Sequence, residues 1–149
     1  MSQVCGLYNR AIEFLQKLNW LPVLLARISM GSIFILSGWG KLHNLPKVTE
    51  FFTELGIPFP GLNAGFVGFT EFSCGILILV GLLTRLASIP LIATMAVAIL
   101  TAKRSDIASI TDVLGFEEFV YSVIFIWFIV NGAGRISLDT FISNRCSKK

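Results

Sequence analysis

The sequence has few charged residues for its length. Aspartate, glutamate, lysine and arginine make up 14% of its 149 residues, whereas hydrophobic residues make up 54%. Soluble domains are typically about 25% charged, and a soluble fold of this size would need more charge to cover its surface. Phenylalanine alone occurs 13 times. The excess of apolar side chains therefore indicates a protein that lies in lipid rather than in water.

Histidine and clustered cysteine are also scarce. The single histidine, His43, excludes bis-histidine haem ligation within one chain. The three cysteines, Cys5, Cys74 and Cys146, are far apart and form no Cys-x-x-Cys pair, which argues against a disulfide framework and against a zinc site. The sequence therefore predicts no bound metal, and Cys74 is expected to be an inert small hydrophobe.

The chain lacks the motifs of the common soluble enzymes. It has no Ser/His/Asp set, no His-Glu-x-x-His and no phosphate loop, and the glycines from Gly132 to Gly134 follow a helix rather than a strand. The net charge of +3 is modest and no basic block is present, which argues against a nucleic-acid partner. Any redox cofactor would therefore be a lipid-soluble quinone or would belong to a partner protein.

Four segments are apolar enough to cross a bilayer, which takes about 20 mostly apolar residues. They are residues 20–41, 64–83, 86–102 and 115–132. The first is too long for the apolar core of a signal peptide, and no small-x-small cleavage site follows it, so we expect an uncleaved span. The prediction is an all-α fold: one membrane domain over residues 1–149, an integral membrane four-helix bundle with short interfacial helices.

Three shorter segments are expected to lie at the membrane surface as interfacial helices. The first covers residues 7–18. The second covers residues 44–55, where a proline follows the expected N-cap and phenylalanines form an apolar side. The third follows Gly134, with either Ser137 or Asp139 as its N-cap. These segments would lie against the lipid headgroups.

The distribution of lysine and arginine predicts the orientation of the bundle, because cytoplasmic loops carry an excess of both. With four spans, both termini lie on the same side of the membrane. That side would hold seven basic residues against four on the other, with Arg27 inside a span. The chain is therefore expected in the plasma (inner) membrane as a multi-pass protein in contact with the lipid bilayer, with both termini cytoplasmic.

Glu71 is the most informative single residue, because it lies well inside the second span. A charged residue at the centre of a membrane helix costs roughly 2.5 to 3.5 kcal/mol on insertion scales. Gly68 and Gly75 share its helical face, and small residues let a neighbouring helix come close, so Glu71 should face the bundle interior. It could carry a proton, or accept a hydrogen bond from a polar ligand headgroup. Equally, it could be a structural tie between helices.

Arg27 lies inside the first span, on the face that also carries Gly31 and Gly38. A long basic side chain near a helix end can extend to the membrane surface and keep its charge in water. Alternatively, Arg27 could point inward and form a buried ion pair with Glu71. Either way, the glycines beside it predict a close-packed face.

Several polar residues map to the outer ends of the spans and could form a polar mouth above Glu71. Tyr121 lies four residues after Glu117 and one turn deeper, where it could donate a hydrogen bond to a buried oxygen or simply pack. For His43 and Lys103, ordinary interface charges are the simpler reading. The residues of this mouth are Lys41, His43, Lys103, Glu117 and Glu118.

These segments together resemble the DoxX family of small four-span membrane proteins, over about residues 26–139. No single piece is specific, but their order and spacing are. The carrying segments are Arg27 with Gly38-Trp39-Gly40-Lys41-Leu42, Leu55-Gly56-Ile57-Pro58-Phe59-Pro60, Glu71 with Gly75, Gly81-Leu82-Leu83-Thr84-Arg85, and Gly132-Ala-Gly134-Arg135-Ile136-Ser137-Leu138-Asp139.

The resemblance implies a four-helix membrane bundle with cytoplasmic termini, in agreement with the charge count. It also implies an association with quinone-linked oxidoreductase complexes, among them terminal quinol oxidase and thiosulfate:quinone oxidoreductase subunits, and with thiol and oxidative-stress systems. The family pattern has a single glutamate after a glycine at the start of the fourth span. Here Glu117 and Glu118 both fit that position, and the sequence does not choose between them.

The leading hypothesis is a redox-associated membrane subunit that binds a quinone between its helices. Glu71 would be the catalytic residue that accepts and releases the proton. The electron-transfer cofactor would belong to a redox protein partner, and the chain could also form a homo-oligomer. The alternative is a non-catalytic scaffold or a small-solute carrier whose buried charges are structural. The expected ligand-binding residues are Arg27, Lys41, Glu117, Glu118 and Tyr121.

Overall fold

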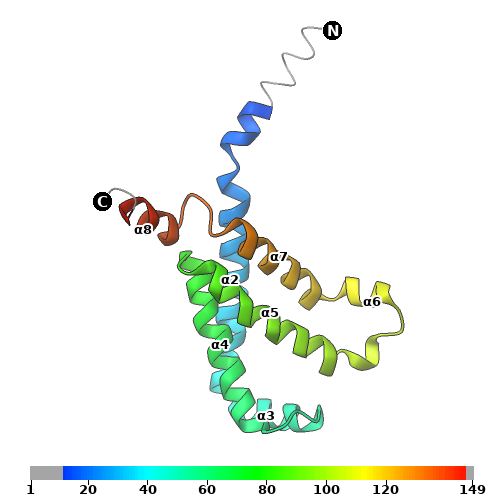
Figure 1. Cartoon of the computed structure of the whole chain (residues 1–149). Helices are drawn as coiled ribbons and strands as arrows, with labels where there is room; N and C mark the ends of the chain where they lie inside the picture. Colours follow the sequence, from blue (N-terminus) through cyan, green and yellow to red (C-terminus); the bar gives the residue numbers. More distant parts are fainter. Residues whose placement is uncertain (1–11, 147–149) are drawn as a thin grey trace.

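The computed structural model describes residues 12–146, and within this part of the chain it contains helices and connecting turns but no strand. The expected all-α membrane fold is thus confirmed. Residues 12–17 are helical; the interfacial helix expected over residues 7–18 begins outside the described part, and its place at the membrane surface stays a prediction. Figure 1 shows the helices and the two ends of the chain.

Four apolar helices form the body of the protein: α2 (Trp20–His43), α4 (Pro60–Val80), α5 (Thr84–Thr101) and α7 (Glu117–Asn131). Among the described residues, α2, α4 and α5 are long and apolar enough to cross a membrane. The fourth expected segment is helical but shorter, because Phe116 is extended and separates the 15 residues of α7 from the short α6 (Ile110–Gly115). At about 1.5 Å per residue, α7 is shorter than the roughly 30 Å of a hydrocarbon core.

The helices pack as two pairs, α2 with α4 and α5 with α7. The tight turn after Gly81 joins α4 to α5, so the two pairs start close together. Figure 1 shows that they diverge from this turn toward α3 and α6. Helix α3 (Leu45–Glu54) packs against the beginning of α4 at the diverging end. The cavity described below lies between the diverging pairs.

Glycines bring α2 and α4 into close contact. A Cβ atom on Gly31 would lie 2.8 Å from the Cβ of Leu79, and one on Gly75 would lie 2.8 Å from the backbone nitrogen of Ile35. A Cβ atom on Gly38 would collide with the backbone of Phe72. The glycine faces expected from the sequence are therefore the contact between these two helices, as is common for helices packed in lipid.

Aromatic side chains join the two helix pairs near the centre of the bundle. Phe34 of α2 meets Phe125 and Tyr121 of α7 edge to face, with ring centroids 5.1 Å and 5.9 Å apart. Phe125 and Phe128 are fully buried, together with Ile78 and Leu91 from α4 and α5. Such aromatic contacts add about 0.5–1.5 kcal/mol each beyond the burial of their surface.

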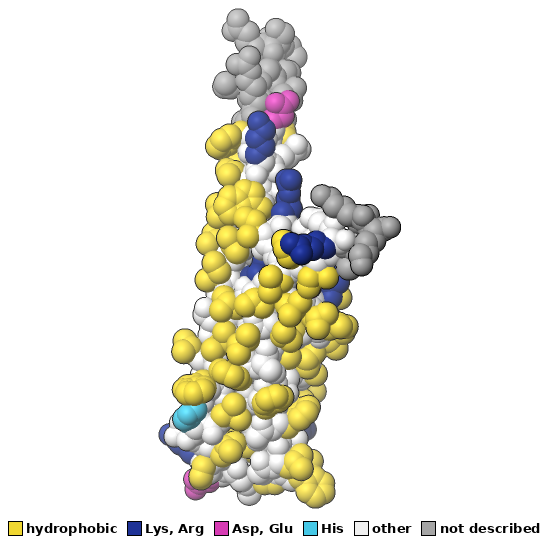
Figure 2. Space-filling view, turned by 90° about the vertical axis from the view of Figure 1, so that its left-hand side faces the viewer, with side chains coloured by type: hydrophobic (Ala, Val, Ile, Leu, Met, Phe, Trp, Pro, Cys, Tyr) yellow, Lys and Arg dark blue, Asp and Glu magenta, His cyan; other side chains and the backbone are white. Residues whose placement is uncertain are grey.

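The outside of the bundle is apolar along the helices. Large hydrophobic side chains of every long helix are exposed, among them Leu36, Phe66, Leu86 and Val130. Figure 2 shows hydrophobic side chains covering one face between charged residues near its lower end and in its upper part. A soluble protein rarely exposes so large a contiguous apolar surface, whereas a bilayer would cover it.

The tail after α7 returns to the turn between α4 and α5. Ser137 is the N-cap of α8 (Leu138–Cys146), because its hydroxyl accepts a hydrogen bond from the backbone N–H of Thr140. The carboxylate of Asp139 accepts hydrogen bonds from the backbone N–H groups of Leu83 and Thr84 at 2.7 Å and 3.1 Å. Of the two expected caps, Ser137 serves α8 itself, and Asp139 caps the start of α5.

Candidate functional site

A cavity of about 980 Å³ lies between the two helix pairs where they diverge. Helices α2, α4, α5 and α7 contribute its walls, and α3 with the segment after it contributes one end. Most of the lining is apolar, and includes Phe51 and Phe52 of α3, Leu55 just after it, Phe66 and Val67 of α4, and Val97 and Ala98 of α5. The size and lining are those of a site for a hydrophobic ligand.

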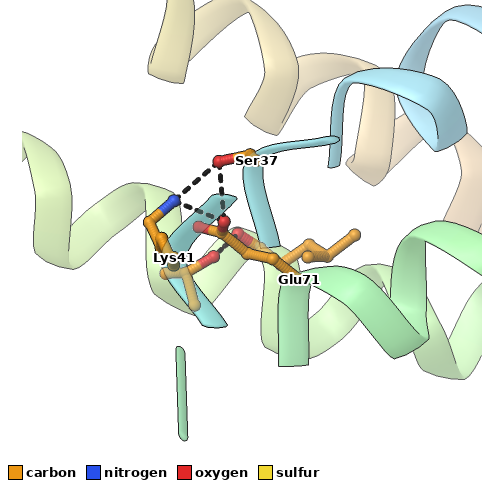
Figure 3. A network of polar contacts seen from close by, with 5 residues as sticks. Ser37, Lys41 and Glu71 are labelled. Carbon is orange, nitrogen blue, oxygen red and sulfur yellow. Dashed lines mark hydrogen bonds and ion pairs between the residues drawn. The ribbon is translucent and has the colours of Figure 1, made fainter. Parts of the chain in front are cut away.

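One wall of the cavity carries a buried ion pair between α2 and α4 (Figure 3). The ammonium nitrogen of Lys41 lies 2.5 Å from Oε2 of Glu71, and the side chains are 26% and 4% exposed, respectively. Ser37 completes the group: its hydroxyl donates to the same Glu71 oxygen at 2.8 Å and accepts from Lys41 at 2.6 Å. Glu71 is therefore a partnered carboxylate that faces the cavity.

The close approach of α2 and α4 explains why these three residues meet. Ser37 and Lys41 are four residues apart and so share one face of α2. Gly38 lies between them and contacts the backbone of α4 at Gly68 and Phe72. Gly68 precedes Glu71 by three residues, so the glycine contact sets the register in which Lys41 reaches Glu71. Lys41 Cβ itself lies 3.2 Å from the position a Cβ of Gly68 would take.

The first two turns of α7 contribute a second polar group to the cavity. Tyr121 donates a hydrogen bond to Oε2 of Glu117 at 3.0 Å, and its ring contacts Phe34. Oε2 of the neighbouring Glu118 is buried and has no hydrogen-bond partner among the described residues. Both glutamates and Tyr121 line the cavity, so the structure gives the two glutamates different surroundings.

The other residues of the expected mouth divide between the cavity and the surface. Lys103 lines the cavity, together with Asp106, and its ammonium lies 5.7 Å from the ring centroid of Phe116. His43 is not among the lining residues. Its ring nitrogen lies 3.0 Å from the carbonyl oxygen of Trp39, and its ring lies against the indole of Trp39, with the two planes tilted by 38°. For His43, the simpler reading of an interface residue agrees with the structure.

Arg27 is placed differently from both alternatives that its sequence position suggested. It is only 3% exposed, so it does not extend to the surface, and the ion pair with Glu71 is wrong. Its guanidinium instead donates to four backbone carbonyls at distances from 2.5 to 3.1 Å, those of Ile78, Leu79, Ala133 and Ile136. Arg27 does not line the cavity.

The geometry of helix ends explains the position of Arg27. The carbonyls of the last turn of α4 have no partner within the helix, and they form the negative end of its dipole. Gly81, with φ +71°, ends that helix, and a Cβ there would collide with the guanidinium of Arg27. Arg27 thus holds α2, the end of α4 and the segment after α7 together, which is a structural role.

Sequence reasoning missed several lining residues. Ser37 was detectable in principle, because it lies one turn before Lys41 on the same face of α2. Thr70 and Asp106, which also line the cavity, carry no comparable signal in the sequence. Residues 44–55 were expected to lie on the membrane surface, and their phenylalanines line the cavity.

The donor set of the cavity suits an uncharged polar ligand better than a metal. No group of three or more histidine, cysteine, aspartate or glutamate side chains in residues 12–146 is arranged to hold a metal ion. The polar residues that line the cavity include an ion pair, a tyrosine and the two glutamates of α7, beside long apolar walls. This combination fits a molecule with a hydrophobic body and one or two hydrogen-bonding groups.

Comparison with known proteins finds relatives along most of the chain. A family model described as DoxX matches residues 22–104. The inner membrane protein YqjF of Escherichia coli (strain K12) is 29% identical over 134 residues, which cover 88% of this chain and 99% of YqjF. The uncharacterized membrane protein Rv3486 of Mycobacterium tuberculosis is 30% identical over 136 residues, 84% of this chain and 83% of that protein.

A third relative carries a functional name. It is named "Putative oxidoreductase CatD", comes from Bacillus subtilis, and is 28% identical over 121 residues, which cover 80% of this chain and 85% of CatD. No solved structure matches this chain significantly. The matched residues 22–104 include Lys41 and Glu71, whereas α7, with Glu117, Glu118 and Tyr121, lies beyond them.

Proposed function

This chain belongs to the DoxX family of membrane proteins, and from that premise we propose that it is a redox-associated membrane subunit that binds a quinone in its cavity. The observation that carries the proposal is the ion pair of Glu71 with Lys41 at the wall of an otherwise apolar cavity of about 980 Å³. One relative at 28% identity is named as an oxidoreductase, which supports the redox class. The electron-transfer cofactor would belong to a protein partner.

The residues of the cavity fit a quinone. Its ring and isoprenoid chain are apolar, as are the walls formed by α3, α4 and α5. Its two ring oxygens accept hydrogen bonds in the oxidised form, and the ammonium of Lys41 can donate one. In the reduced form the ring hydroxyls can also donate, and the cavity residues Glu118 and Tyr121 have oxygens that can accept. Phe34 and Tyr121, which meet edge to face, both line the cavity, and an aromatic side chain there can pack against a quinone ring.

When bound, a quinone supplies two-electron chemistry coupled to two protons. The protein would supply the proton path. Glu71 can hold a proton at Oε2, and Lys41 and Ser37, both within 2.8 Å of that oxygen, can donate to the carboxylate or return a proton to it. Because Glu71 is almost fully buried while Lys41 is about a quarter exposed, Lys41 is the member of the pair that can exchange protons with the surface.

The proposal is tested with Glu71→Gln. Glutamine keeps the shape of the side chain and can still form hydrogen bonds, but it cannot titrate. We expect the variant to fold, although with a lower melting temperature, and to lose the quinone-linked activity. The activity is measured as membrane quinone reduction or as resistance of cells to oxidants, at protein levels matched to the wild type. Glu50→Gln is the matched control, because Glu50 is exposed on α3 and does not line the cavity. The quinone content of the purified protein is the direct measurement.

The second candidate function is a non-catalytic scaffold or a small-solute carrier, in which the buried charges are structural. Arg27 favours it, because this charge bonds only to backbone carbonyls and holds three chain segments together. If Glu71 were a structural tie of the same kind, Glu71→Gln would leave activity unchanged at equal protein abundance. That result would remove the proton role and leave the scaffold ahead.

A further inference from the structure

The three glutamates of the cavity differ in the hydrogen bonds that their carboxylate oxygens accept. Oε2 of Glu71 accepts from Lys41 and Ser37, and Oε2 of Glu117 accepts from Tyr121. Oε2 of Glu118 has no hydrogen-bond partner among the described residues, although this atom is buried. A buried acceptor without a partner is unfavourable, by roughly 1–3 kcal/mol in typical cases. Glu118 lines the cavity, and this oxygen is closed off in the present position of the side chain. A ligand would bond Glu118 after its carboxylate turns toward the cavity, and that bond would remove the unsatisfied acceptor.

Glu118 lies at the N-terminal end of a helix, in a cavity that a lysine also lines. It lies in the first turn of α7, where the positive end of the helix dipole stabilises an anion. Lys103, a further basic residue, lines the same cavity. An ionised carboxylate can only accept hydrogen bonds, whereas a neutral carboxylic acid can also donate one. The group that Glu118 needs from a ligand is thus a donor, an O–H or an N–H.

We propose that Glu118 accepts a hydrogen bond from a ring hydroxyl of the ligand, so that the cavity binds a hydroquinone more tightly than the corresponding quinone. This inference rests on the proposed function and specifies its ligand. The two oxidation states have nearly the same shape, but only the hydroquinone carries O–H donors. A quinone would place a carbonyl oxygen against the carboxylate, and the two acceptors would repel each other.

The inference also distinguishes the two adjacent glutamates of α7. Glu117 holds Tyr121 in place through the hydrogen bond to its hydroxyl and is a positioning residue. Glu118 would contact the ligand directly. Sites built to bond a substrate hydroxyl discriminate strongly against an analogue that lacks it. Because Glu118 as a residue is only partly buried, we expect a preference of about tenfold to a hundredfold, the range of a hydrogen bond to a charged group.

The experiment measures equilibrium binding to the full-length protein in lipid nanodiscs under anaerobic conditions. The probes are a decyl-substituted benzoquinone, its hydroquinone, and the dimethyl ether of that hydroquinone, which keeps the ring but has no O–H. The variants are Glu118→Gln and the exposed control Glu50→Gln. Retention of radiolabelled probe gives each dissociation constant, and activity plays no part in the readout.

The wild-type protein and the Glu50→Gln control should bind the hydroquinone at least tenfold more tightly than either probe without a donor. In Glu118→Gln the dissociation constants of the quinone and the hydroquinone should differ by no more than about threefold, because an amide can either accept from a hydroxyl or donate to a carbonyl. The preference of the wild-type protein for the hydroquinone is measured without any variant, so the test holds even if Glu118→Gln fails to fold. Circular dichroism and gel filtration of each variant check folding.

Three results would contradict the inference. Equal binding of all three probes, or tighter binding of the quinone, would leave the proposed quinone site standing but overturn the donor preference. A preference that persists in Glu118→Gln would show that another residue produces it. Failure of every probe to bind would remove the proposed function, and the role of Glu118 with it.

Discussion

The ammonium group of Lys41 bonds the carboxylate of Glu71 across the contact of α2 and α4, at 2.5 Å between nitrogen and oxygen. Both residues lie on helices that are long and apolar enough to cross a membrane. Removing one member of a buried pair is more costly than removing both, because the remaining charge is left without a partner. The pair can therefore be detected by comparing single and double variants.

A double-mutant cycle on Lys41→Met and Glu71→Gln should reveal this coupling. Each single variant should unfold at a lower temperature than the wild type, and the double variant should lose less than the sum of the two. We expect a coupling energy of about 1–3 kcal/mol, measured by thermal unfolding in detergent. The same cycle on Lys47 and Glu50, two exposed residues three positions apart on α3, should give a coupling of no more than about 0.5 kcal/mol. Additivity at Lys41 and Glu71 would show that the pair contributes nothing measurable.

Two glycines on the same helix give a matched test of the α2–α4 contact. A Cβ at Gly38 would collide with the backbone of Phe72, whereas a Cβ at Gly40 would have nothing within 4 Å. Gly38→Ala should therefore destabilise the protein by about 1–3 kcal/mol or more, since backbone cannot move aside easily. Gly40→Ala should be neutral or stabilising, because alanine favours the helix by up to about 1 kcal/mol. Similar melting temperatures for both variants would argue against this close contact.

Arg27→Lys tests the structural role of the arginine. A guanidinium has five N–H donors in a fixed fork, and here it reaches four carbonyls on two separate segments. A lysine has the same charge but cannot bond all four. We expect a loss of at least about 2 kcal/mol in stability, with binding of ligand to the cavity unchanged in protein that remains folded. Arg104→Lys, at an exposed position, is the control; an equal effect of both variants would contradict the role.

Much of this fold could be predicted from one sequence because the signals are local. Long apolar runs predicted the four helices, and glycines at three- and four-residue spacing predicted the faces on which α2 and α4 meet. The burial of Glu71 followed from the same glycines, since a carboxylate beside a close-packed face points away from lipid. The functional roles assigned to Glu71 and to the other cavity residues stay predictions.

The partners of the buried charges could not be predicted, because they depend on the register between helices. Arg27 and Lys41 lie 14 positions apart on α2, so either could have been placed at the depth of Glu71 by a shift of one helix along the other. The structure places Lys41 there. The partners of Arg27 are backbone carbonyls of helix ends, and a backbone carbonyl has no residue-specific signature in a sequence.

The orientation of the bundle is the last prediction. With the four spans that the sequence predicts, the side that holds both termini would carry seven lysines and arginines, and the opposite side four, including Lys41 and Lys103 at the cavity. Because basic loops remain in the cytoplasm, a reporter fused after Lys149 should be cytoplasmic and one inserted near Lys47 should be external. Paired reporters, one active only in the cytoplasm and one only outside, measure this directly, and equal abundance of the fusions is the control. The opposite pattern would overturn the charge argument and place the cavity end, where Lys41 meets Glu71, toward the cytoplasm.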